Sequence, residues 1–152
     1  MIPRGIDMSP YKLKMLFRTG MMDDIQPYEF ADGISLRDYQ NDAVNRWIRA
    51  HRNGIIVAPC GAGKTMMGLG AITKCKGVKT IVLVHTADLA SQWTERINAQ
   101  LKSGTGIKPP HVTLYGNGKK DDSGDIVVAS FQTLARMRFD DLLSFGKQFG
   151  LC

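Results

Sequence analysis

Short apolar runs alternate with longer amphipathic stretches from residue 34 to the end of the 152-residue chain. Short runs rich in valine and isoleucine and bounded by glycine, proline or polar residues are typical of strands buried on both faces of a parallel sheet. Four segments have this character, and we expect strands at 54–58, 80–84, 111–114 and 125–129.

Amphipathic helices are predicted around these strands. The sequence Ser35-Leu36-Arg37-Asp38 has the form of a capping box, in which a serine N-cap and an acidic residue at the third helical position satisfy unpaired N–H groups. The helix that follows is expected to end at Asn53-Gly54. Its apolar face is predicted at three- and four-residue spacing by Leu36, Tyr39, Ala43, Trp47 and Ile48.

Two further helices are expected between the strands. One covers about 64–75, and the other follows the strand at 80–84, with an apolar face made by Leu89, Trp93, Ile97 and Leu101. Strands that alternate with helices predict a doubly wound α/β fold with a mainly parallel sheet flanked by helices. The segments 102–110 and 116–124 are rich in glycine, proline, lysine and aspartate and are expected to be surface loops.

The domain organisation predicted from these patterns has two parts. Residues 1–33 are expected to be an irregular lead-in segment, in which a short basic helix could begin after Ser9. Residues 34–152 are expected to form the α/β domain. The chain is long enough for one globular domain with a core.

A glycine-rich segment follows the first predicted strand and opens the first of the interstrand helices. It reads Ala58-Pro59-Cys60-Gly61-Ala62-Gly63-Lys64-Thr65, which has the context and spacing of a P-loop. In such a loop, glycines let backbone N–H groups turn toward phosphate, and the helix N-terminus adds its positive dipole. We therefore expect ATP to bind here, with Lys64 bridging the β- and γ-phosphates and the Thr65 hydroxyl as a ligand of Mg²⁺.

The cysteines and the net charge bear on the kind of site and partner that the chain could have. Cys60, Cys75 and Cys152 are scattered, without the spacing of a zinc site, and are expected to be reduced thiols. The net charge is +6, and residues 53–152 carry twelve Lys and Arg against seven Asp and Glu. A basic surplus in the part that holds the P-loop favours a polyanionic partner. The sequence contains neither a long apolar run nor a secretory signal, so we expect a cytoplasmic protein without membrane association.

With Leu36-Arg37-Asp38-Tyr39-Gln40 placed 24 residues before Lys64, the chain resembles superfamily 2 helicases. The resemblance implies a RecA-like fold and adds Arg37 and Gln40 to the nucleotide site, with Gln40 reading the adenine edge. An amide both donates and accepts, which suits that role; a solvent-facing glutamine on an amphipathic helix is the alternative. Within the loop the resemblance implies contacts from Pro59, Cys60, Gly61, Ala62, Gly63, Lys64, Thr65 and Met66.

Two later segments resemble nucleic-acid-contacting motifs of the same superfamily, in its XPB-like and type I/III restriction branches. Residues 82–93 resemble motif Ia and imply a backbone contact by Thr86, although Ala87 stands where many relatives have arginine. Residues 124–134 resemble the next contacting motif and imply contacts by Ser130 and Thr133. A plain amphipathic helix is the alternative for the first segment. For the second segment the alternative is a helix start, because serine and threonine are favoured N-caps.

The end of the chain resembles the start of the strand that leads into the Asp-Glu-x-His box of these helicases. The resemblance therefore implies the front part of the first RecA-like domain of a DNA helicase or translocase, incomplete at its C-terminus. The parent protein is expected to be an ATP-dependent helicase, and the 152-residue chain alone is expected to be inactive because hydrolysis also needs the acidic motif.

Two alternatives remain open from the sequence. The first is a non-catalytic nucleotide- or DNA-binding module that acts with a partner, and the second is another P-loop enzyme such as a small-molecule kinase. Nucleic acid is the expected partner, with DNA favoured over RNA by the branch resemblance. Self-association through an incomplete sheet is also expected, since unpaired strand edges and exposed apolar surface promote it.

Overall fold

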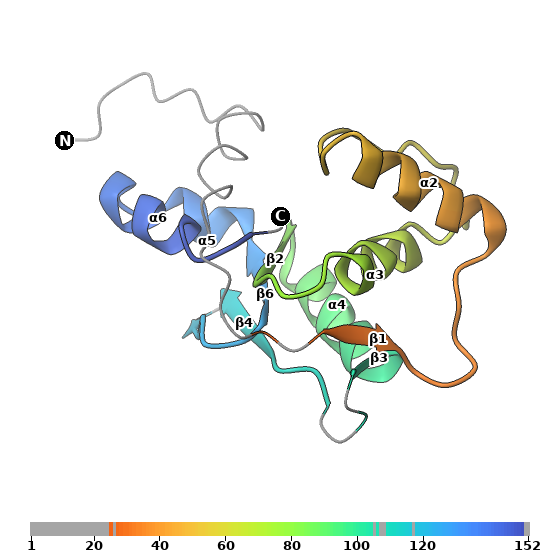
Figure 1. Cartoon of the computed structure of the whole chain (residues 1–152). Coiled ribbons are helices and arrows are strands. Elements are labelled where there is room, and N and C mark those ends of the chain that lie inside the picture. The colour runs from red at the N-terminus through yellow and green to blue at the C-terminus, as the bar shows by residue number, and fades with distance from the viewer. Residues whose placement is uncertain (1–24, 26, 105, 107–108, 117, 151–152) are drawn as a thin grey trace.

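The protein is described by a computed structural model in which residues 25, 27–104, 106, 109–116 and 118–150 are placed (Figure 1). The helix predicted after Ser9 lies outside these residues. None of the helices in the described segments is both long enough and apolar enough to span a membrane.

The centre of the fold is a four-stranded sheet with the order β2-β6-β4-β5. It consists of β2 (Thr80–Val84), β6 (Ile126–Ser130), β4 (Val112–Gly116) and β5 (Lys119–Lys120). β6 pairs in parallel with both β2 and β4, whereas β5 returns antiparallel to β4 in a short hairpin. The strands predicted at 80–84, 111–114 and 125–129 are confirmed, the last two with bounds one or two residues later.

Helices cover both faces of this sheet, as predicted for an α/β fold (Figure 1). α3 (Lys64–Lys74) and α4 (Ala87–Gln100) pack on one face through a cluster that contains Leu69, Ile97 and Val128. α5 (Phe131–Ala135) and α6 (Phe139–Gly146) lie on the other side, where α6 contributes Leu142 and Phe145 to a second cluster with Val127. Ser130 is the N-cap of α5, in agreement with the alternative of a helix start in this segment, whereas the sequence did not predict α6. Because successive residues of a strand point to opposite faces, β6 contributes to both clusters.

The helix before the P-loop begins later than the sequence predicts. α2 (Asp38–Arg49) has Arg37 as its N-cap, and the Arg37 N–H donates to Gln40 Oε1 at 3.0 Å. The capping interaction therefore involves the side chain of Gln40, and the prediction of Ser35 as N-cap was wrong. Leu36 stays outside the helix because it packs on Gly70 of α3, where a Cβ would lie 2.6 Å from a Leu36 methyl group. α2 also ends at Arg49 rather than at Asn53-Gly54, with His51 and Arg52 at positive φ.

The strand predicted at 54–58 is absent from the described structure, and this prediction was wrong. The segment is not part of either sheet, and Ile55 and Val57 are 90% and 91% exposed. An apolar run becomes a buried strand only where neighbouring strands accept its backbone hydrogen bonds and helices cover its side chains. Neither is provided for Ile55 and Val57 by the described residues.

A second, two-stranded sheet joins the lead-in segment to the end of α4. β1 (Tyr28–Phe30) pairs antiparallel with β3 (Leu101–Ser103). The first was expected to be irregular, and the second falls where a helix end and a loop were predicted. The Tyr28 hydroxyl donates to a carboxylate oxygen of Asp125, the residue before β6, and so ties this small sheet to the main one.

The last described residues pack against the start of β2. Lys79 Nζ donates to the Asp122 carbonyl oxygen at 2.6 Å and to Gln148 Oε1 at 2.7 Å, and lies 5.5 Å from the centre of the Phe149 ring. The Gly150 N–H donates to the Lys79 carbonyl oxygen at 2.9 Å. Phe149 and Gly150 are not in a strand, although Phe149 is fully buried; Leu151 and Cys152 lie outside the described residues.

Candidate functional site

The P-loop adopts a tight turn that ends at the first residue of α3. Gly61 has φ +80° and Gly63 has φ +75°, left-handed conformations that residues with a Cβ rarely adopt. Gly63 is the N-cap of α3, and Lys64 and Thr65 are its first two residues. The first N–H groups of a helix have no intrahelical acceptor and carry the positive end of its dipole. The predicted loop therefore presents backbone donors at the place where an anion would bind.

Lys64 lies over the loop that precedes it. Its ammonium group donates to the Pro59 carbonyl oxygen at 3.1 Å, and the Ala62 N–H donates to the same oxygen at 3.3 Å. Lys64 and Cys60 are exposed, whereas Met66 packs partly against the core. The lysine charge is thus accessible to a phosphate group at the helix start.

Two side chains of α2 contact the P-loop. The Tyr39 hydroxyl and the Gln40 Nε2 each donate to the Ala62 carbonyl oxygen at 2.9 Å. Gln40 is buried, with only 4% of its surface exposed, and Tyr39 is half-exposed. Gln40, predicted from the resemblance to belong to the nucleotide site, therefore lies against the loop, and Arg37 is an exposed residue at the start of the same helix.

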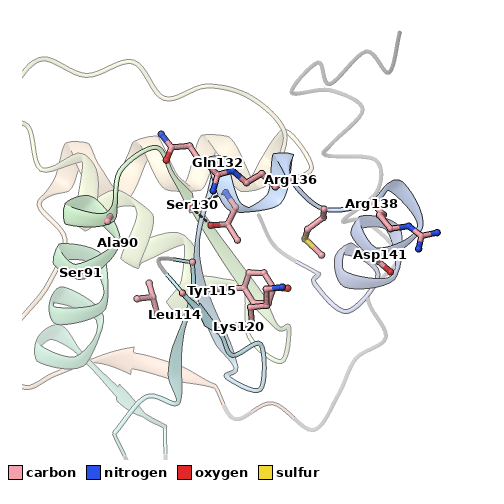
Figure 2. Close-up of a pocket in the computed structure, with 15 residues that line it drawn as sticks. Ala90, Ser91, Leu114, Tyr115, Lys120, Ser130, Gln132, Arg136, Arg138 and Asp141 are labelled. Carbon is pink, nitrogen blue, oxygen red and sulfur yellow. Dashed lines mark hydrogen bonds between the residues drawn. The ribbon is translucent and has the colours of Figure 1, made fainter. Parts of the chain in front are cut away.

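The described chain contains a separate groove of about 790 Å³ at the carboxyl ends of the parallel strands (Figure 2). It is lined by residues that follow three strands: Ala87 after β2, Gly116 at the end of β4, and Ser130 at the end of β6. In open α/β sheets ligands bind at this edge.

The predicted nucleic-acid contacts Ser130 and Thr133 both line the groove, whereas Thr86 is not among the lining residues. The Ser130 and Thr133 hydroxyl oxygens are 2.8 Å apart, and Ser130 Oγ also accepts the Thr133 N–H at 3.3 Å. The Thr86 hydroxyl accepts the Leu89 N–H at 3.2 Å and caps α4. All three hydroxyls lie near helix starts. Any role of these residues in binding a ligand would therefore be in addition to their hydrogen bonds at the helix N-termini.

The groove gathers positive charges that the sequence interpretation missed. Lys120 comes from the β4–β5 hairpin, and Arg136 and Arg138 come from the segment between α5 and α6 (Figure 2). Arg136 lies beside Ser130 and Gln132, and Arg138 lies on the α6 side with Asp141. The available signal was the pair Arg136-x-Arg138, which begins three positions after Thr133.

Ionisable groups next to the groove and the core show the effect of burial. Burial raises the pKa of the Tyr115 phenol, and the negative charges of Asp122 and Asp141 raise this pKa further. Burial also raises the pKa of the Cys75 thiol, so this cysteine is a neutral core residue. Among the described residues no group of three or more His, Cys, Asp or Glu side chains could hold a metal ion.

Comparison with known proteins finds similar proteins that are named DNA helicases or translocases. The chain is 50% identical over 76 residues to "DNA 3'-5' translocase XPB2" of Sulfurisphaera tokodaii, which covers 50% of this chain and 17% of the relative. It is 35% identical over 112 residues to "Putative DNA 3'-5' helicase Rad25" of Halobacterium salinarum, which covers 71% of this chain and 18% of the relative.

A eukaryotic relative extends the match further along the chain. The "General transcription and DNA repair factor IIH helicase/translocase subunit XPB" of Schizosaccharomyces pombe is 29% identical over 129 residues, 80% of this chain and 15% of the relative. The chain thus spans less than a fifth of the length of these three curated relatives.

The match to a family model covers most of the chain. Residues 33–151 match the family described as "Type III restriction enzyme, res subunit", a range that includes the P-loop, the α2 contacts and the basic groove. The expected resemblance to superfamily 2 DNA helicases is confirmed, and the chain belongs to the type III restriction enzyme res-subunit family.

Proposed function

We propose that this chain forms the ATP-binding and DNA-contacting part of an ATP-driven DNA translocase or helicase. One observation carries the proposal: the P-loop ends at the N-terminus of α3, with Gly61 and Gly63 in left-handed conformations and the Lys64 ammonium group exposed. The groove at the carboxyl edge of the sheet, with Lys120, Arg136 and Arg138, supplies a second, separate site for a polyanion.

The nucleotide half of the proposal rests on the loop 59–65. Gly61 and Gly63 have the backbone conformations that such a turn needs, and Lys64 offers an exposed ammonium group at the start of α3. The chain's donors fit a triphosphate, and Thr65 in the first turn would hold its magnesium ion. ATP with Mg²⁺ supplies the free energy for movement in such motors, while these residues bind and orient it.

The nucleic-acid half rests on the groove. Lys120, Arg136 and Arg138 provide charge for backbone phosphates, and Ser130 and Thr133 provide hydroxyl groups between them. Contacts to phosphates position a protein on nucleic acid without reading its sequence. That is the kind of contact expected of a translocase, and the names of the relatives favour DNA.

Hydrolysis by this chain alone is expected to be negligible. The P-loop binds phosphate, but turnover also requires a positioned water and a second side of the magnesium site. The 152 residues contain no Asp-Glu dipeptide of the kind that performs this role in the family. The proposed activity of the chain is therefore binding, and motion belongs to the whole protein.

The test is calorimetric binding of magnesium with a non-hydrolysable ATP analogue to the wild-type chain, to Lys64→Ala and to Lys76→Ala. Lys76 is exposed and lies at the opposite edge, between α3 and β2. We expect binding by wild type and Lys76→Ala, and at least about a tenfold loss in Lys64→Ala, as removing a charged hydrogen-bond donor costs about 1.5–3 kcal/mol.

The same samples are then titrated with fluorescent duplex DNA and assayed for ATP turnover. Wild type that binds neither the nucleotide analogue nor DNA would contradict the proposal. Nucleotide binding without DNA affinity would instead favour another kind of P-loop protein.

A further inference from the structure

The Ala62 carbonyl oxygen accepts two side-chain hydrogen bonds from α2. Tyr39 donates through its hydroxyl and Gln40 through Nε2, both at 2.9 Å, and Gln40 Nε2 also lies 3.4 Å from the Tyr39 hydroxyl oxygen. The other end of the Gln40 amide is engaged as well, because Gln40 Oε1 accepts the Arg37 N–H. The two neighbouring side chains therefore act on one carbonyl group in the middle of the phosphate loop.

Holding this carbonyl fixes the direction of the next N–H. In a trans peptide the C=O of one residue and the N–H of the next point in opposite directions, and no described peptide bond is cis. With the Ala62 C=O directed at α2, the Gly63 N–H is directed away from α2. Gly63 is the N-cap of α3, at the helix end that would bind phosphate.

The loop needs such an anchor because its own backbone is permissive. Ala62 lies between Gly61 and Gly63, and glycine adopts positive and negative φ with similar ease. A rotation of the Ala62–Gly63 peptide would exchange an inward N–H for an inward carbonyl oxygen, which repels phosphate. The hydrogen bonds to Ala62 oppose that rotation.

We propose that Tyr39 is a positioning residue of the phosphate loop: its hydroxyl, together with the Gln40 amide, holds the Ala62–Gly63 peptide so that the Gly63 N–H faces the polyphosphate. This inference rests on the proposed nucleotide site and specifies how affinity is set there. Tyr39 acts on the loop and not on the base, so its contribution is the same for every nucleotide and for a polyphosphate without a base.

Because Tyr39 is half-exposed, its role in the loop can be tested with a variant that is expected to fold. Tyr39 is 47% exposed, so replacing tyrosine with phenylalanine removes the hydroxyl and leaves the packed part of the side chain in place. Any stacking of the ring on a base also survives the change. The variant Tyr39→Phe therefore reports on the hydrogen bonds of the Tyr39 hydroxyl, to the Ala62 carbonyl oxygen and from Gln40 Nε2.

The experiment compares wild type, Tyr39→Phe and Tyr28→Phe in calorimetric titrations with magnesium and three probes: a non-hydrolysable ATP analogue, the corresponding GTP analogue, and tripolyphosphate. Tyr28→Phe is the matched control, because Tyr28 also donates through its hydroxyl, but to Asp125 and away from the loop. Circular dichroism at the titration temperature checks that each variant is folded.

We expect Tyr39→Phe to lower the affinity for all three probes by the same factor, about 3- to 10-fold. This is the usual contribution of one neutral hydrogen bond. Tyr28→Phe is expected to leave the three affinities unchanged. Equal affinities of wild type and Tyr39→Phe would overturn the inference, as would a change for the ATP analogue without a change for tripolyphosphate. Wild type that binds none of the probes would instead refute the proposed nucleotide site itself.

Discussion

The side chain of Gln40 fills the space next to the Cα atom of Gly63. A Cβ atom added at Gly63 would lie 2.4 Å from Gln40 Nε2, closer than any real contact of this kind. Because that nitrogen also donates a hydrogen bond to the Ala62 carbonyl oxygen, the side chain has little freedom to move away. The helix before the loop and the loop itself thus fit together only when residue 63 is glycine.

Gly63→Ala is expected to lower both stability and nucleotide affinity. The change combines a left-handed backbone, which costs roughly 1–2 kcal/mol for a residue with a Cβ, with displacement of the Gln40 amide. Urea denaturation and titration with a non-hydrolysable ATP analogue measure the two effects.

Gly61→Ala is the matched control for this prediction. Gly61 has a similar φ of +80°, but a Cβ there meets nothing within 4 Å. We expect Gly61→Ala to show the backbone cost alone. If both variants lose the same stability, the contact with Gln40 has no energetic role.

Removing positive charge from the groove is expected to lower both the affinity for DNA and the dependence of that affinity on salt concentration. Each lysine or arginine that contacts a phosphate releases counterions, so Lys120→Ala or Arg136→Ala should reduce the slope of log K against log salt by about 1. Fluorescence anisotropy at several salt concentrations measures the slope. Lys76→Ala serves as the control for net charge, and a slope change of equal size in this variant would exclude a specific contact in the groove.

The hydrogen bond from Tyr28 to Asp125 is expected to make stability depend on alkaline pH. Burial, followed by the hydrogen bond to Asp125, raises the pKa of Tyr28 above its ordinary value of 10.0. A group whose pKa is raised on folding contributes stability that is complete below the unfolded pKa and is lost as pH rises toward the folded one. Above pH 10 the free energy of unfolding should therefore fall by about 1.4 kcal/mol per pH unit for this group.

Tyr28→Phe tests this dependence. The variant should be less stable by roughly 1–3 kcal/mol at neutral pH, because it leaves Asp125 without its partner. It should also lose less stability above pH 10 than wild type, with the remaining slope due to groups such as Tyr115, whose pKa is also raised. Urea titrations across this pH range give both quantities, and parallel curves for the two proteins would argue against the assignment.

Self-association is expected at the segment 54–58. Ile55 and Val57 are almost fully exposed, and exposed β-branched residues in an extended segment favour pairing with another chain. Sedimentation velocity over a range of concentrations should show oligomers of the wild-type chain. The double variant Ile55→Thr, Val57→Thr should shift this equilibrium toward monomer, whereas a concentration-independent monomer for wild type would contradict the prediction.

The sequence predicted those elements whose local pattern and tertiary environment agree. β2 follows from a short apolar run and α4 from apolar spacing, whereas the P-loop follows from its motif and α3 from its place after that motif. The segment 54–58 carries an equally clear strand pattern, but a strand also depends on hydrogen-bonding neighbours, which a local pattern does not contain. β1 and β3 have three residues each, and they pair although Tyr28 and its partner Ser103 lie far apart in the sequence, a relation that no local pattern contains.

The residues of the candidate site were also predicted where they are contiguous in the sequence and missed where the fold brings them together. The residues of the loop are contiguous, so spacing alone identified them. Lys120 and Arg136 come together because β4 lies beside β6 in the sheet, and nothing in the sequence near either residue states that order. The contact of Gln40 with Ala62 was missed for a related reason, since the resemblance indicated a base contact and the packing of α2 on α3 decided its partner.

β6 has two equally apolar faces, and this has a consequence for how the sheet finds its register during folding. A shift of β6 by one residue would exchange Val127 and Val128 between the two clusters at little hydrophobic cost, so its side-chain pattern does not specify the register. The specifying contacts lie at its beginning, where Asp125 binds Tyr28 and the Gly124 N–H donates to Thr113 Oγ1 at 3.2 Å. The contact of Tyr28 with Asp125, together with that of Gly124 with Thr113, thereby favours the alignment of β6 that places Ser130 in the groove.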